Sequence, residues 1–222
     1  MKQWEELFNR AVRQLEAGKI AKGSWSFGGG TALMNIFKHR LSQDIDIFLA
    51  DRQLLAYVSP RVNDGAGEPN EYVEQDRFVR LQFDQGEIDF IAAPSVTPLK
   101  PDFKKIAGNF AYVEHPAEIV AKKIAYRAEN FKPRDIFDLA VVYSHRPAET
   151  LRIAPFVADK IAIVSERLER FESSGTFEAF ARDMEILEGG RKVRGRELAI
   201  CRECLIEMEK HKTLSHNQGL SR

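Results

Sequence analysis

The spacing of hydrophobic residues predicts helix, strand and helix over the first forty or so positions. Apolar side chains from Trp4 to Leu15 recur every three or four residues, which predicts an amphipathic helix that Gly18 ends. A short apolar run at 25–27 predicts a strand, and helical spacing resumes at 31–38 after three consecutive glycines. We therefore expect a tight glycine loop between this strand and this helix.

The next segments follow the two-residue period of strands. Residues 44–49 alternate acidic and apolar side chains, so a strand here places Asp44 and Asp46 on one face. Two further runs, 78–83 and 87–92, are separated by a short turn that ends in glycine, which predicts a hairpin. Its second strand carries Glu87 and Asp89 on one face.

The pattern becomes helical beyond a final predicted strand at 110–114. Pro116 and Pro133 each stand where proline is favoured, at the first position of a helix. Helical spacing continues over three later segments, which are 153–171, 176–186 and 194–214. We predict an α/β (α+β) domain with a mixed sheet and flanking helices, followed by a helical domain, with bounds 1–112 and 113–222.

The remaining segments carry little regular pattern. Turn-forming residues fill 59–70, which predicts a mobile loop, and the polar residues 215–222 predict a frayed end. The 33 basic and 33 acidic residues cancel, so net charge does not indicate a partner. No apolar run approaches the ~18 to 20 residues that span a bilayer, and the N-terminus is unlike a signal peptide. We expect a soluble, cytoplasmic protein without a membrane partner.

The only two cysteines, Cys201 and Cys204, have C-x-x-C spacing. Such a pair can bind zinc or act as a redox pair, but a zinc site needs a second pair of ligands. The surrounding residues have helical periodicity, which favours packing of these thiols against a helix stripe.

Two carboxylates on one face of a strand repel each other unless cations lie between them. Asp44 and Asp46 are therefore candidate ligands of Mg²⁺ or Mn²⁺, and Asp89 on a neighbouring strand is a candidate third ligand. A solvated strand face is the ordinary alternative for such a pair.

A glycine-rich turn that enters a helix exposes backbone N–H groups and can hold phosphates. The glycines at 28–30 and Thr31 fit this description, although a plain turn fits it too. The glycine turn and the acidic strand come in succession, which would place a phosphate cradle beside a metal site. This combination is much rarer than either part.

The sequence resembles the AbiEii/AbiGii-type nucleotidyltransferase toxins of the polymerase β nucleotidyltransferase superfamily. Two blocks carry the resemblance at the start, GGTAL at 29–33 and HRLSQDIDIF at 39–48. A later block, KKIAYRAENFKPRDIFDLAVV at 122–142, is similar to the family's motif of a lysine, an arginine one turn on and an RDxxDL segment. The resemblance covers roughly residues 25–145.

This resemblance implies roles for individual residues. It implies that Gly29, Gly30 and Thr31 hold the triphosphate of an NTP, and that Asp44 and Asp46 hold the metal. Lys123 would contact phosphate, and Arg127 lies four positions on, on the same helical face. A solvated helix face is the alternative for these two cations.

Four further residues belong to the resembling blocks with less defined roles. Asp135 and Asp138 share a helix face, and either one orients an acceptor hydroxyl, positions Lys123 or joins an ion-pair network. His39 and Arg40 precede the acidic strand as loop-fixing or phosphate-contacting residues. We include Asp138 among the catalytic candidates and Arg40 among the phosphate-binding ones.

The resemblance implies transfer of a nucleoside monophosphate from an NTP to an acceptor, in a cleft between the two domains. RNA, particularly tRNA, is the expected acceptor, and the basic runs at 100–105 and 191–196 could follow its backbone. A toxin of this kind would have a cognate antitoxin. The alternatives are transfer to a small molecule or a protein, or a catalytically silent binding partner with the same fold.

Overall fold

The computed structural model describes residues 2–212 and divides into two compact units. The sheet unit comprises Met1–Ile36, Ser42–Pro94 and Lys100–His115, and the helical unit comprises Phe37–Leu41, Ser95–Leu99 and Pro116–Arg222. The main division thus falls at Pro116, and two short segments of the first half belong to the helical unit. None of the helices in the described part is long and apolar enough to cross a membrane.

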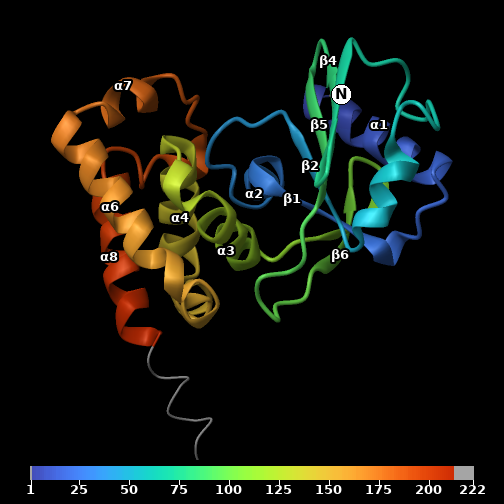
Figure 1. Cartoon of the computed structure of the whole chain (residues 1–222). Coiled ribbons are helices and arrows are strands. Elements are labelled where there is room, and N and C mark those ends of the chain that lie inside the picture. The colour runs from blue at the N-terminus through green and yellow to red at the C-terminus, as the bar shows by residue number, and fades with distance from the viewer. Residues whose placement is uncertain (1, 213–222) are drawn as a thin grey trace, which may run out of the picture. The chain divides into compact units, whose positions relative to one another are not determined.

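The sheet unit contains one seven-stranded mixed sheet in the order β3-β4-β5-β2-β1-β7-β6 (Figure 1). The pairs β1–β7 and β2–β5 are parallel, and the other neighbours are antiparallel. This confirms the predicted mixed sheet with flanking helices. The strand bounds are β1 Trp25–Gly28, β2 Ile45–Leu49, β3 Glu71–Gln75, β4 Phe78–Phe83, β5 Gly86–Ala92, β6 Asp102–Ile106 and β7 Asn109–Val113.

The two faces of this sheet differ in burial. On one face Ile45, Ile47 and the β5 residues in register with them are fully buried, and helix α1 (Gln3–Ala17) packs against these strands (Figure 1). The rings of Phe8 in α1 and Phe27 in β1 lie 4.8 Å apart between centroids. The other face, which we call the open face, carries Asp46 and the residues in register with it. Alternation along β2 therefore separates the core from the candidate chemistry, as predicted.

Two strands, β3 and β6, are absent from the sequence prediction, and both are edge strands. All but one residue of β6 is exposed, and β3 has no buried residue. An edge strand with so few buried side chains shows no apolar alternation to recognise. Within residues 2–212, the 3-10 helices are η1 Lys22–Ser24, η2 Arg52–Val58, η3 Ala128–Asn130, η4 Ala154–Phe156 and η5 Glu188–Gly190.

The helical unit confirms both proline-initiated helices. Pro116 begins α3 and Pro133 begins α4. The later helices are shorter than predicted, and α5 was not predicted. The last predicted helix ends at Leu214, and the predicted frayed end covers 215–222. Residues 213–222 lie outside the part of the chain that the structure describes. The bounds are α3 Pro116–Arg127, α4 Pro133–His145, α5 Pro147–Leu151, α6 Ala158–Ser174, α7 Phe177–Arg182 and α8 Glu197–His211.

Two short segments from the first half of the sequence are bound into the helical unit by hydrogen bonds. The Thr97 amide donates to the Glu118 carboxylate of α3 at 2.9 Å. The Leu41 amide donates to the Glu185 carbonyl at 2.8 Å, and Arg40 forms a bridge with Ile186. These contacts explain why the division does not follow a single boundary along the chain.

Both cysteines lie on α8 and pack inside the helical unit. Cys201 and Cys204 are free thiols with no exposed surface. Burial raises the pKa of each thiol above its ordinary range. The burial agrees with the packing role that helical periodicity favoured.

Candidate active site

The strand-to-helix junction at the glycines brings the Asp46 carboxylate against the backbone. β1 ends at Gly28, whose register partner is Asp46, and α2 (Gly29–Phe37) begins at the next residue. A Cβ atom on Gly29 would lie 1.8 Å from Asp46 Oδ2, and Gly29 has φ +68. Only glycine combines this conformation with this close approach. The predicted separate loop is absent, because Gly29 and Gly30 already form the first helical turn.

Thr31 holds the start of the acidic strand. Its side chain is fully buried, and its hydroxyl donates to the Asp44 carbonyl at 2.6 Å. The same hydroxyl lies 3.0 Å from Ser42 Oγ. Asp44 Oδ1 in turn accepts from the Glu87 amide of β5 at 3.2 Å. Thr31 therefore fixes the backbone of Asp44, and the triphosphate contact that the resemblance implies for it stays a prediction.

Asp89 lies on the neighbouring parallel strand, where it is in register with Asp46. Arg80 of β4, which the sequence analysis missed, donates to both oxygens of Asp89, at 2.7 and 2.8 Å. It also lies 3.3 Å from Glu87. The hydrogen bond with Asp89 raises the pKa of the Arg80 guanidinium. A fixed positive charge thus stands beside the candidate metal carboxylates.

Among residues 2–212, no three carboxylate, imidazole or thiol groups are clustered as a ready metal site. The predicted third metal ligand, Asp89, forms an ion pair with Arg80 in this structure. Its role as a metal ligand therefore stays a prediction.

Glu114 is a second open-face residue that the sequence did not reveal. It is 5% exposed and accepts from the Ser26 hydroxyl at 3.1 Å. A Cβ atom on Gly28 would lie 2.6 Å from Glu114 Oε2. Gly28 thus allows this carboxylate to lie beside the strand that precedes the glycine turn. The end of a short strand offers no signal in the sequence that would have identified it.

In the helical unit, Asp138 of α4 is the centre of a buried network. Its carboxylate accepts two hydrogen bonds from Arg40, at 2.7 and 2.8 Å, and lies 2.9 Å from Lys123 Nζ. His39 Nε2 is 2.8 Å from the same group. Burial alone would raise the pKa of Asp138, but the Arg40 and Lys123 charges and these hydrogen bonds hold it well below its ordinary value.

Asp135 is the second acid of this network. Lys123 Nζ lies 2.5 Å from Asp135 Oδ1, and Arg127 lies 3.6 Å from the same oxygen. Burial tends to raise the pKa of Asp135, and the charges of Lys123 and Arg127 lower it overall. Arg127 is 40% exposed, so it carries the accessible positive charge of the group. Of the alternatives for these acids, the contacts match positioning of Lys123 within an ion-pair network.

His39 is buried and its protonation is opposed by its surroundings. Burial lowers its pKa, and the hydrogen bond to Asp138 only partly offsets this. An unfolded histidine takes up a proton near pH ~6.5. Below that pH the unfolded chain binds more protons than the folded chain, so His39 reduces stability as pH falls, by up to ~1.4 kcal/mol per pH unit.

We therefore expect His39→Gln to weaken the pH dependence of the free energy of unfolding between about pH 7.5 and 5.5. Glutamine keeps a donor for Asp138 but does not titrate. Urea unfolding followed by helical circular dichroism measures this free energy at each pH. His145→Gln is the control, because His145 lies exposed in the same unit. An unchanged slope in the His39 variant would contradict the expectation.

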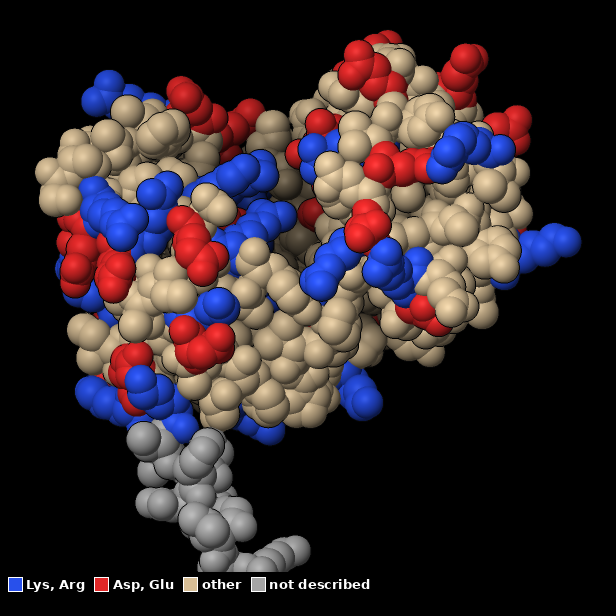
Figure 2. All heavy atoms as spheres, in the orientation of Figure 1, with Lys and Arg blue, Asp and Glu red and all other residues tan. Residues whose placement is uncertain are grey.

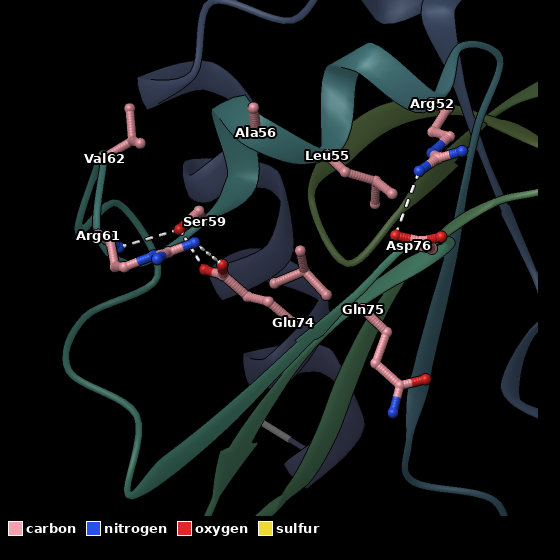
Figure 3. A pocket seen from close by; sticks show the side chains of 10 residues that line it. Arg52, Leu55, Ala56, Ser59, Arg61, Val62, Glu74, Gln75 and Asp76 are labelled. Atoms are coloured by element: carbon pink, nitrogen blue, oxygen red, sulfur yellow. Dashed lines mark hydrogen bonds and ion pairs between the residues drawn. The ribbon is translucent and has the colours of Figure 1, made fainter.

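A cavity of about 350 Å³ in the sheet unit is not lined by the candidate metal ligands Asp44, Asp46 and Asp89. It is formed by η2, β3 and β4, and Figure 3 shows Arg61 and Glu74 pointing toward each other at its wall. Val79 lines it and points to the face opposite Arg80, its neighbour along β4. Its charged side chains also pair with one another, Arg61 with Glu74 and Arg52 with Asp76. This cavity therefore belongs to the other face of the sheet.

The predicted site residues thus fall into two groups, one in each unit. The sheet unit brings together Gly29, Gly30, Thr31, Asp44, Asp46 and Asp89. The helical unit brings together Arg40, Lys123, Arg127, Asp135 and Asp138. Arg80 and Glu114 are the additions that required the structure.

Comparison with known proteins agrees with the resemblance carried by the motif blocks. The chain is similar in fold to MenT4, a nucleotidyltransferase toxin from Mycobacterium tuberculosis H37Rv, with a TM-score of 0.52 and 13% sequence identity. That likeness covers 96% of this chain and 91% of that one, and at this identity it shows the fold alone. No curated protein sequence matches the chain. The profile of the family described as nucleotidyl transferase AbiEii toxin, type IV toxin–antitoxin system, matches residues 15–190, and the chain therefore belongs to the AbiEii family of nucleotidyltransferase toxins.

Proposed function

We propose that this nucleotidyltransferase moves a nucleoside monophosphate from an NTP to an RNA acceptor, in a reaction that depends on a divalent metal. One observation carries the proposal, namely the contact of the Asp46 carboxylate with the backbone at the first turn of α2. A carboxylate oxygen thus lies beside the N-terminus of a helix, where backbone N–H groups bind phosphates favourably, and this supports a metal and triphosphate site here. Family membership supports the transfer itself.

The open-face carboxylates fit Mg²⁺ or Mn²⁺. Asp44 and Asp46 are both partly exposed, and their hard oxygen atoms are the ligands that these ions prefer. We propose these two residues as the principal ligands, with Asp89 as the third. A bound divalent ion would stabilise negative charge on the attacking and leaving oxygens of the transfer.

The protein's own groups have separate tasks in this proposal. The amides of Gly29 and Gly30 hold the triphosphate, and Thr31 keeps Asp44 in place through its backbone. Arg80 limits the repulsion between Asp89 and its neighbouring carboxylates. We propose that the positive charges of Lys123 and Arg127 offset the negative charge of the phosphates, and that Arg40 adds to this positive charge. Asp138 positions Lys123.

The acceptor proposal rests on resemblance and local charge. The chain has no net positive charge, but Figure 2 shows Lys and Arg side chains gathered on the visible face of the helical unit. The basic runs at 100–105 and 191–196 offer phosphate contacts as well. As the toxin of a type IV system, the protein has an antitoxin as its expected partner.

Label transfer from each of the four α-labelled NTPs, with Mg²⁺, tests the function. Total bacterial RNA, total protein and a small-molecule extract serve as acceptors. We expect labelled RNA from the native chain and none from Asp46→Asn or in the presence of EDTA. Asp64→Asn is the matched control, because Asp64 is an exposed acid of the same unit.

Each other outcome identifies a different function. Label in protein or in a small molecule would replace RNA as the acceptor. Transfer that persists in Asp46→Asn or with EDTA would contradict the metal-dependent mechanism. The absence of transfer to all three pools would favour a binding role for this fold.

A further inference from the structure

The hairpin formed by β6 and β7 presents two exposed aromatic rings with a half-buried ring beside them. Phe103 and Phe110 are 53% and 50% exposed, and their rings stack with centroids 5.5 Å apart. Tyr112 lies beside Phe103 at 4.9 Å. Lys105 is the register partner of Phe110, so its side chain lies on the same face. We call these four residues the hairpin patch.

A tight turn holds the hairpin. Ala107 and Gly108, which join the strands, have φ angles of 46 and 92. Positive φ at both central residues is the geometry of a two-residue turn that matches the twist of the strands. The next residues inward on the opposite face, Ile106 and Ala111, are buried. The rings are therefore exposed on a supported strand pair, since Ile106 and Ala111 anchor the opposite face near the turn.

The hairpin patch lies on the same face of the sheet as the candidate metal carboxylates. Tyr112 alternates with buried neighbours in step with Glu114, which contacts Ser26 on the open face. Ser26 is in register with Phe48, and Asp46 lies two residues before Phe48 on that same face. β7 and β2 are separated only by β1, so they are about 10 Å apart at the usual strand spacing.

The chemistry of the patch favours nucleic acid over protein. Exposed aromatic rings on a sheet surface stack against unpaired bases, and nearby lysines bind the phosphates. Lys105 lies among the rings, and Lys100 is exposed nearby, whereas Lys104 lies on the opposite face and pairs with Asp102. Lysine is depleted in the cores of protein–protein interfaces, which makes a lysine among the rings unfavourable for a protein partner.

We propose that the hairpin patch binds a single-stranded segment of nucleic acid by stacking its bases on Phe103, Phe110 and Tyr112. The assignment of that segment to the acceptor rests on the proposed function. Because the patch and Asp46 share one sheet face, a strand stacked on the rings would extend toward the carboxylates. The patch would then act in holding the acceptor, with no part in the chemical step.

Binding of a fluorescent single-stranded RNA of mixed sequence, about 12 nucleotides long, to the full chain tests the patch directly. Phe103→Thr/Phe110→Thr removes both rings and keeps residues that suit strands. We expect this variant to bind roughly 5- to 150-fold more weakly for each stacked base lost. Phe103→Tyr/Phe110→Tyr keeps the rings and is expected to retain affinity. Phe180→Thr is the matched control, because Phe180 is 57% exposed in the helical unit.

Label transfer to RNA by the same variants separates this inference from the proposed function. We expect the threonine variant to raise KM for RNA with little change in kcat. Unchanged RNA affinity in that variant would overturn the patch, even if the native chain labels RNA. RNA binding that needs the rings, without any label transfer, would support the patch and overturn RNA as the acceptor. A change only in oligomeric state, with RNA affinity intact, would identify a protein-binding surface and overturn the proposal.

Discussion

Gly29→Ala is expected to reduce nucleotide transfer by at least about 100-fold, although it adds a single methyl group. The added Cβ would lie 1.8 Å from Asp46 Oδ2, so the carboxylate must leave its position. A displacement of about 1 Å in a reacting group is enough for a loss of this size. The positive φ of Gly29 adds backbone strain of ~1–2 kcal/mol for alanine.

Two other glycines separate these causes. Gly175, which follows α6, also has a positive φ, but a Cβ there would meet nothing within 4 Å, so Gly175→Ala imposes strain alone. Gly23→Ala imposes neither strain nor contact. The assay is label transfer at saturating NTP, with circular dichroism to compare folding. If Gly29→Ala and Gly175→Ala were equally active, the contact with Asp46 would not be what the reaction needs.

Asp138→Ala is expected to lower the free energy of unfolding of the helical unit by about 3–5 kcal/mol. Asp138 is fully buried and neutralises Arg40, which is 6% exposed, and part of the Lys123 charge. Without its carboxylate, Arg40 would remain buried and would lose the acid that accepts two of its hydrogen bonds. The loss reflects an uncompensated charge more than the net strength of the ion pairs.

Urea unfolding followed by helical circular dichroism measures this loss. Asp159→Ala is the matched control, because the Asp159 side chain is 77% exposed and lies 3.8 Å from Lys160. Arg40→Met/Asp138→Leu removes both charges and should recover much of the stability lost in Asp138→Ala. If Asp138→Ala were as stable as the control, the network would not support the fold of this unit.

Stability of the network also has a direct pH signature. The folded pKa of Asp138 is depressed, so its contribution is fully present above the unfolded value of ~3.9 and is lost as pH falls through the folded pKa. His39 acts in the same direction at higher pH, beginning near ~6.5. The helical unit is therefore expected to be sensitive to acid in two steps.

The sequence was sufficient to predict strands and helices where burial of one face imposes a regular spacing of apolar residues. The alternation at β2, the helical spacing of α1 and the prolines that begin α3 and α4 each reflect a strong local requirement. The glycine turn and the acidic strand were recognisable because their order is rare. Their contact at Gly29 and Asp46 then followed from the antiparallel pairing of β1 with β2.

Other features depend on contacts between distant parts of the chain. Arg80 reaches Asp89 only through the register of β4 with β5, and Glu114 reaches Ser26 only because β7 pairs with β1. The segments 37–41 and 95–99 join the helical unit through hydrogen bonds that leave no periodic pattern. Neither their attachment nor the edge strands could be predicted from local spacing.

The two buried thiols give the helical unit a built-in chemical probe. They are the only cysteines in the chain, and α8, which carries both, packs against the helix of Asp138. A thiol reagent can therefore react only when this packing opens, and its rate in excess reagent records how often that happens. Opening of one half of the protein can thus be followed in the intact chain, without an added label and with no signal from the sheet.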